Sequence, residues 1–165
     1  MNERPKIKIP LTKFDFFLEI VCLILLLAGW IFVLSIFSKL PAKIPTHFNL
    51  HDEIDAYGNR TFIFLFPILS LVFYLGFTFL QKIPHFYNYP VEITEENAFR
   101  QYRLSVQFIR IIKLILLIIF SVSVVEIYGI SIEKINGFGI FYVLFIFASI
   151  FLTVGVYFFR SKAQK

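Results

Sequence analysis

Three long runs without a charged residue constrain this chain more than any other feature of its sequence. They are Ile20 to Ser38 with 19 residues, Thr61 to Gln81 with 21 residues, and Ile135 to Phe159 with 25 residues. A helix needs about 20 predominantly apolar residues to cross the hydrocarbon core of a bilayer. The runs also lack the polar–apolar alternation of transmembrane strands. Each run therefore predicts a membrane-spanning helix.

The composition supports this class of protein. The 165 residues are 58% hydrophobic and 16% charged, whereas a soluble domain has about 25% charged residues. A soluble domain of this length still exposes roughly 30% of the surface of its unfolded chain. Its interior is therefore too small to bury this many apolar residues. A single cysteine, Cys22, excludes a disulfide scaffold. We predict an all-α integral membrane protein.

A fourth span is interrupted by polar residues. Leu114 to Val125 is apolar but short, and extending it back to Leu104 takes in Gln107, Arg110 and Lys113. A charge near a helix end is tolerated because long side chains reach the interface. The prediction is one membrane domain over residues 1–165 with an outer loop at 39–60, a cytoplasmic loop at 82–103, and spans at about 16–38, 61–81, 104–127 and 136–159.

The basic residues predict the orientation of these four spans. Of the 16 Lys and Arg residues, those predicted on one side are Arg4, Lys6, Lys8, Lys13, Lys82, Arg100, Arg103, Arg110, Lys113, Arg160, Lys162 and Lys165. The other side holds Lys39, Lys43, Arg60 and Lys134. The positive-inside rule places both termini in the cytoplasm. The net charge of +5 then reflects topology and attraction to anionic lipid, and calls for no nucleic-acid partner.

The third span is predicted to belong to a longer helix. Thr94 is suited to an N-cap, and no Pro or Gly follows until Gly129, so a helix is expected from Glu95 to about Tyr128. One polar stripe along it consists of Glu96, Arg100, Arg103, Gln107 and Arg110. Two interpretations stay open for the stripe. It is either a wet face with snorkelling arginines or a buried seam in which Glu19 pairs with Arg110 or Lys113.

The outer loop carries the other group of polar residues. Pro41 and Pro45 favour an extended chain. His47, His51 and Asp55 are weak candidates for a metal site, although no metal is predicted. The alternative is a set of solvated residues in which a hydrogen bond from His47 holds the loop. Asp55, close to Gly58, suggests an Asx-turn.

Two blocks of residues resemble a known family. The first comprises Leu40-Pro41, Ile44 to Asn49 (Ile-Pro-Thr-His-Phe-Asn) and Asp55 to Gly58 (Asp-Ala-Tyr-Gly). The second comprises Asn88 to Val91, Ile93 to Ala98 and Arg100 to Tyr102. Together they resemble a small bacterial membrane domain of unknown function that also forms the N-terminal part of SdpI-type immunity proteins.

The resemblance implies a binding role for the outer-loop motif, through His47, Asn49, Asp55, Tyr57 and Gly58. The sequence departs from the family at Asp52, where a turn-forming glycine is common; Asp adopts left-handed geometry less readily than Gly. Full SdpI-type proteins also carry further helices downstream of the four predicted here.

The expected function is non-enzymatic: immunity, sensing or interaction in a bacterial cell membrane, with no cofactor. No hydrolase, metalloprotease, phosphate-loop or redox motif is present in the sequence. Expected partners are the lipid bilayer and a membrane-bound or peptide ligand. A homo-oligomer is compatible with the small-residue face of Ser149, Thr153 and Gly155. Alternatives are a metal-dependent enzyme at the outer loop and a small carrier that uses the Arg110 seam.

Overall fold

The computed structural model describes residues 4–49 and 51–164 and is mostly helical. Its helices are α1 (Lys13–Ile36), α2 (Leu65–Leu80), α3 (Ala98–Ser131) and α4 (Ile140–Ala163). Short 3₁₀ segments cover Phe37–Lys39, Arg60–Phe64 and Pro84–Phe86, and the strands are β1 (Lys43–Phe48) and β2 (Ile54–Asn59). With the 3₁₀ turns that extend α1 and α2, four helical segments of the described chain are long and apolar enough to cross a membrane.

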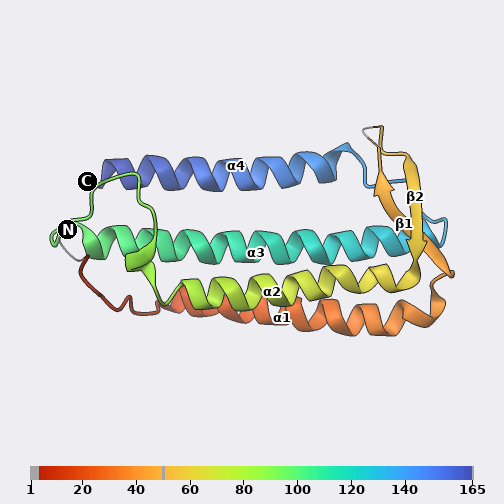
Figure 1. Ribbon diagram of the computed structural model, residues 1–165, viewed down its shortest axis with the longest axis horizontal. Helices are drawn as coiled ribbons and strands as arrows, with labels where there is room; N and C mark the ends of the chain where they lie inside the picture. The colour runs from red at the N-terminus through yellow and green to blue at the C-terminus, as the bar shows by residue number, and fades with distance from the viewer. Residues whose placement is uncertain (1–3, 50, 165) are drawn as a thin grey trace.

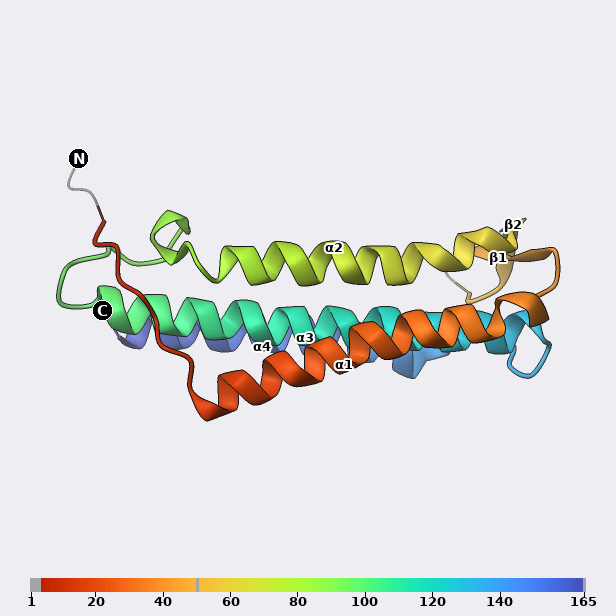
Figure 2. The ribbon, with the colours of Figure 1, turned by 90° about the horizontal axis from the view of Figure 1, so that it is seen from below.

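Helix α3 is the centre of the bundle. It packs against all three other helices, with α1 and α2 on one side and α4 on the opposite side (Figures 1 and 2). The outer surface of α4 is strongly apolar, and Phe141 and Phe159 are 84% and 77% exposed. A side chain at Gly155 would meet nothing within 4 Å. The small-residue face of α4 therefore makes no close helix contact inside the bundle at this glycine.

The two ends of the bundle differ in what they carry. Figure 1 shows both ends of the chain and the α2–α3 connection at one end, and both strands at the other. We call these the termini end and the hairpin end. The connection 82–97 and the hairpin region 39–60 thus lie at opposite ends of the helices, and residues 98–103 of the predicted loop 82–103 belong to α3.

Local hydrogen bonds set where the helices begin. Helix α1 begins at Lys13, before the predicted residue 16, because Thr12 and Asp15 form a reciprocal capping box: Asp15 N–H donates to Thr12 Oγ1 and Thr12 N–H donates to Asp15 Oδ2. Thr94 and Asn97 exchange the same pair of bonds before α3. Here, however, residues 95–97 form a turn, so α3 runs over Ala98–Ser131 and not from Glu95 to Tyr128, and Asn97 takes the N-cap position predicted for Thr94.

The start of α4 also differs from the prediction. Residues 132–139 form an irregular loop that starts with a turn, and the helix begins at Ile140, not near residue 136. Gly139 has φ +75°, a conformation that glycine adopts without strain. A right-handed helix cannot pass through a residue with this φ, so α4 cannot extend back beyond Gly139.

The region predicted as an outer loop is an antiparallel β-hairpin. Lys43 pairs with Asn59 and Phe48 with Ile54, with irregular register between Pro45 and Phe48. The prolines predict an extended chain correctly, but the pairing of the two strands was not predicted. Ile44, fully buried, anchors the hairpin in the core formed with Val33, Ile36, Leu40, Ile63, Val124 and Ile127.

Half-buried tyrosines order the connection at the termini end. Tyr87 donates its hydroxyl proton to the carbonyl of Leu80, and the Tyr89 hydroxyl lies 2.8 Å from the carbonyl of Pro84. Burial raises the pKa of Tyr87 to about 12 and raises the pKa of Tyr89 as well. Both phenols therefore stay neutral and can act as donors. Arg4 reaches the same segment and donates to the carbonyl of Tyr87 at 2.5 Å.

A second polar contact joins α3 to α4 at this end. The Gln101 amide donates to the carbonyls of Ser161 and Gln164, each at 2.9 Å. Ser161 Oγ donates back to Gln101 Oε1 at 2.6 Å. Both side chains are fully buried, so each depends on the other for its hydrogen bonds.

Replacing Gln101 with Met should destabilise the fold by about 1–3 kcal/mol, because the buried Ser161 hydroxyl and the Gln164 carbonyl lose their Gln101 partner. Thermal unfolding of the detergent-solubilised protein measures the loss. Arg103→Met, an exposed position on the same helix, is the control and should change stability by no more than about 0.5 kcal/mol. Equal losses in the two variants would contradict the pairing.

Candidate binding pocket and buried charge network

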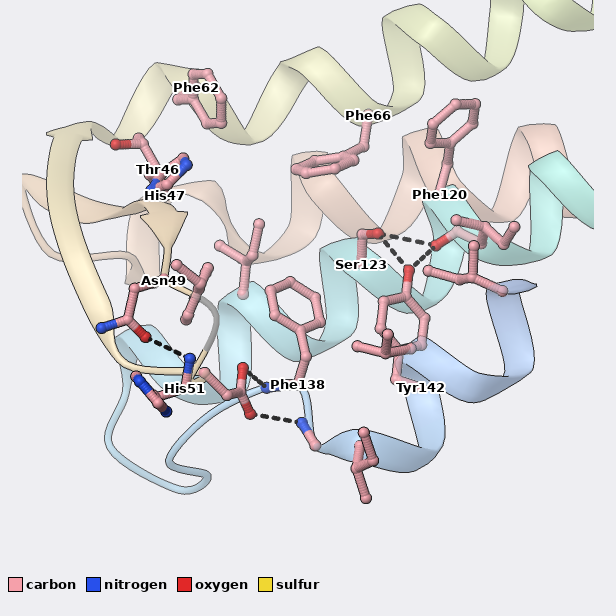
Figure 3. A pocket seen from close by; sticks show the side chains of 18 residues that line it. Thr46, His47, Asn49, His51, Phe62, Phe66, Phe120, Ser123, Phe138 and Tyr142 are labelled. Atoms are coloured by element: carbon pink, nitrogen blue, oxygen red, sulfur yellow. Dashed lines mark hydrogen bonds between the residues drawn. The ribbon is translucent and has the colours of Figure 1, made fainter. Parts of the chain in front are cut away.

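The hairpin covers a pocket of about 830 Å³ at its end of the bundle (Figure 3). Residues of the hairpin and its turn, Thr46 to Asn49 together with His51 and Asp52, form its rim. The remaining lining comes from Phe62 and Phe66 before and within α2, from Ile119, Phe120, Ser123 and Ile127 of α3, and, before and within the first turns of α4, from Phe138, Gly139, Ile140, Tyr142, Val143 and Ile146. This volume lies in the range of small-molecule sites.

Aromatic contacts and one hydroxyl pair hold the α4 wall of the pocket. The Phe138 ring packs against Phe48 at 4.9 Å and against Tyr142 at 5.2 Å between centroids. The Tyr142 hydroxyl lies 2.9 Å from the carbonyl of Ile119 and 2.7 Å from Ser123 Oγ. Figure 3 shows this pair at the deep side of the pocket. The wall is therefore fixed to α3 by hydrogen bonds as well as by packing.

Asp52 ties the hairpin to the beginning of α4. Its carboxylate accepts the N–H groups of Phe138 at 3.1 Å and Gly139 at 2.8 Å, where Gly139 is the N-cap residue of α4. A carboxylate at a helix N-terminus also interacts favourably with the helix dipole. The approach requires a glycine nearby, because a Cβ at Gly137 would lie 2.4 Å from Asp52 Oδ2.

Asp52 occupies the position at which the resembled family commonly has glycine. Its φ is +63°, so the turn does need the left-handed conformation, which Asp tolerates better than most residues. In this chain Asp has a structural role at position 52: its carboxylate bonds the two amides that precede α4, which a glycine could not do because it has no side chain.

The residues of the outer-loop motif have separate roles. The His47 ring nitrogen Nδ1 lies 2.5 Å from Asp55 Oδ1, which joins β1 to β2. The predicted Asx-turn at Asp55 is wrong, because this carboxylate faces His47 across the hairpin. Asn49 forms the turn instead: its Oδ1 accepts the N–H groups of His51 and Glu53.

The last two motif residues lie on β2. Tyr57 pairs with Pro45 and is 60% exposed, and Gly58 pairs with Ile44. A Cβ at Gly58 would lie 2.7 Å from Thr46 Cγ2, so glycine allows the close approach of the strands. Of the five predicted binding residues, His47 and Asn49 line the pocket; Asp55, Tyr57 and Gly58 lie outside its lining and hold the hairpin.

The metal candidates do not form a coordination set. Within residues 4–49 and 51–164, no three His, Cys, Asp or Glu side chains come close enough to hold one ion. His47 meets Asp55, whereas His51 belongs to the turn. The structure therefore gives no support to a metal-dependent site at the hairpin.

A second polar site lies inside the bundle, near the termini end. Arg110 reaches Asp15 at 3.0 Å and Glu19 at 3.2 Å, and Lys113 reaches Glu19 at 2.5 Å. We call these four residues the charge network. The Lys113 side chain is fully buried and the Arg110 side chain is 6% exposed. Two carboxylates face two cations, so the network is neutral as a whole.

Helix α2 completes the surroundings of Lys113. The ammonium donates to Thr78 Oγ1 at 3.1 Å and lies 4.8 Å from the centre of the Tyr74 ring. The network thus connects α1, α2 and α3 through a single cation.

Each of the two interpretations left open by the sequence holds for part of the predicted polar stripe, which begins just before α3 and continues along it. Glu96, Arg100 and Arg103 are exposed, Gln107 is half-buried, and Arg110 is buried. The expected contact of Glu19 is present with both Arg110 and Lys113. Asp15 was not predicted as a partner, although its spacing of four from Glu19 on one helix face was a readable signal.

Comparison with known proteins gives a family match over the part of the chain that contains the hairpin. A family model described as Domain of unknown function (DUF1648) matches residues 24–71, from within α1 through the hairpin into α2. An uncharacterised protein of Archaeoglobus fulgidus is 30% identical over an alignment of 113 residues, and the match covers 64% of this chain and 60% of that relative. The aligned part thus spans less than two thirds of the relative's length. No solved structure matches the chain. The charge network lies outside residues 24–71.

Replacing Glu19 with Gln should cost about 3–5 kcal/mol, because it leaves the Lys113 ammonium buried opposite a neutral amide. The double variant Glu19→Gln/Lys113→Met should lose less than the single variant, since no unpaired charge remains. Thermal unfolding and the level of folded protein in the membrane fraction give the comparison. A single variant with unchanged unfolding and level would contradict the pairing.

Replacing Asp52 with Gly should release the hairpin from α4 without straining the turn, since glycine accepts φ +63°. Hydrogen exchange at the Phe138 and Gly139 amides should become at least tenfold faster, because two charge-assisted bonds are lost. Asp55→Gly is the control: it removes a hairpin carboxylate that does not touch α4. Unchanged exchange in Asp52→Gly would show that the link contributes nothing in solution.

Proposed function

We propose that this chain is a multi-pass integral membrane protein with both termini in the cytoplasm. Four helical segments have the required length and apolar character, and the exposed face of α4 suits contact with lipid. The charge asymmetry of the sequence supports the orientation. Of the twelve basic residues counted on the cytoplasmic side, eleven lie among the described residues: nine in segments at the termini end and two, Arg110 and Lys113, in the charge network. The hairpin then lies on the outer side.

Its role in this proposal is recognition without catalysis, as an SdpI-type immunity, sensing or interaction protein of a bacterial cell membrane. The observation that carries this is the 830 Å³ pocket that the hairpin covers. The polar groups around it are engaged in structural bonds: His47 with Asp55, Asp52 with the α4 amides, and Ser123 with Tyr142. A pocket of this kind is suited to holding a partner.

The orientation can be measured with single cysteines, because the native Cys22 is buried. A membrane-impermeant maleimide should label His51→Cys in intact cells and should label Lys162→Cys only after the cells are opened. The reverse pattern, or equal labelling of both positions before lysis, would contradict the proposed topology.

The recognition role is tested in cells that make the protein. Val143→Trp fills the pocket from α4, whereas Leu144→Trp adds the same ring at a neighbouring position that is 54% exposed and outside the pocket lining. Deletion of the gene should reduce survival under challenge with a panel of membrane-active peptides. Leu144→Trp should restore survival and Val143→Trp should not. Equal survival of the two variants, or an unchanged deletion strain across the panel, would contradict the role.

A further inference from the structure

The pocket has the form of a groove between two helices. Helices α2 and α4 each pack on α3, so α3 is the floor and the other two are walls (Figure 3). The hairpin closes one end. Phe62 and Phe66 lie on the α2 wall, and Val143 and Ile146 lie on the α4 wall. In the proposed membrane orientation, the groove would open sideways between α2 and α4 toward the lipid.

Polarity changes along the length of this groove. The hairpin end has the imidazoles of His47 and His51 and the amide of Asn49, whereas the lining toward the bundle centre is Ile119, Phe120 and Ile146. Ile146 lies six residues into α4, or about 9 Å from its start. Ile119 lies twelve residues before the end of α3, or about 18 Å from it. The groove therefore passes from a polar rim to an apolar depth that would lie in the hydrocarbon layer.

The groove presents no charge for a buried ligand group to pair with. Asp52 is the one charged residue in the lining, and both of its oxygens accept α4 amide bonds. The hydroxyls of Ser123 and Tyr142 bond each other. An occupant must consequently place an uncharged apolar part in the depth and a polar part at the rim, because an unpaired charge or polar group in the depth would lose its hydration without compensation.

We propose that the groove binds one phospholipid of the outer leaflet, with an acyl chain between α2 and α4 and the head group against the hairpin turn. This proposal rests on the membrane orientation proposed above. A lipid matches the lining at both ends, and it enters from the bilayer through the open side of the groove without crossing the hairpin. The imidazole of His51, at the turn of the hairpin, supplies a donor at the level of the phosphate.

The test uses the full chain in phosphatidylcholine vesicles that contain a phosphatidylcholine probe with a diazirine at the end of one acyl chain. After irradiation, mass spectrometry of peptides locates the adducts. Labelling at Ile119, Phe66 and Ile146 should exceed labelling at Leu27 and Leu34, which are 52% and 63% exposed on α1. A second probe with the diazirine near the phosphate should label residues 46–51 instead.

The pair of α4 variants separates a bound lipid from bulk lipid. Val143→Trp should reduce groove labelling several-fold and leave labelling of α1 unchanged, and Leu144→Trp should leave both unchanged. Gel filtration and circular dichroism establish that both variants are folded. Labelling spread in proportion to exposure, or equal labelling of the groove in both variants, would overturn the proposal, as would an unlabelled groove that crosslinks to a peptide or to a second copy of the chain.

The same variants show which proposal has failed. If Val143→Trp abolishes survival in the peptide challenge while groove labelling is no higher than on α1, the pocket functions in recognition but does not hold a lipid. If groove labelling falls in Val143→Trp while survival is unaffected, the lipid site stands and the recognition role at this pocket does not.

Discussion

The rest of the bundle depends on the neutral arrangement of Asp15, Glu19, Arg110 and Lys113. Burying a cation is costly unless an opposite charge lies within bonding distance, and here each cation has a carboxylate at 3.2 Å or less. These ion pairs also determine the orientation of α3. Arg110 must face α1 and Lys113 must reach α1 and α2 together, so the rotation of α3 about its axis is determined. That rotation in turn decides which residues of α3 are presented to the hairpin end.

The pocket follows from this placement. With α3 held against α1 and α2, the surface bearing Ile119, Phe120 and Ser123 is left as a floor, and α4 packs beside it through the Tyr142 hydroxyl. The hairpin closes the end because Ile44 is buried in the core and Asp52 bonds the start of α4. The pocket lies at the hairpin end and the charge network lies nearer the termini end, and α3 contributes residues to both.

The local backbone conformation of the hairpin could be predicted from the sequence, but the pairing of its two strands and its contact with the start of α4 could not. Pro41 and Pro45 predict extended backbone, and Asn49 and Asp52 predict a turn, because these preferences depend on single residues. The pairing of His47 with Asp55 and the irregular register beside Pro45 depend on how two strands meet. The small distance between Asp52 and Gly137 involves residues 85 positions apart in the printed sequence, and no local pattern encodes it.

The sequence by itself determined the number of long apolar helices, their approximate positions and the segregation of basic residues, and it offered the pairing of Glu19 with α3 as one of two interpretations. Each of these follows from one dominant free-energy cost, either of exposing apolar surface to water or of burying an unpaired charge. Such costs can be inferred from the type and spacing of residues. Only the tertiary structure decided that Asp15 joins the charge network, that the outer loop is a hairpin bonded to α4, and that a groove lies beneath it. Those features arise from the relative rotation and packing of helices, which many weak contacts set together and no single residue reveals.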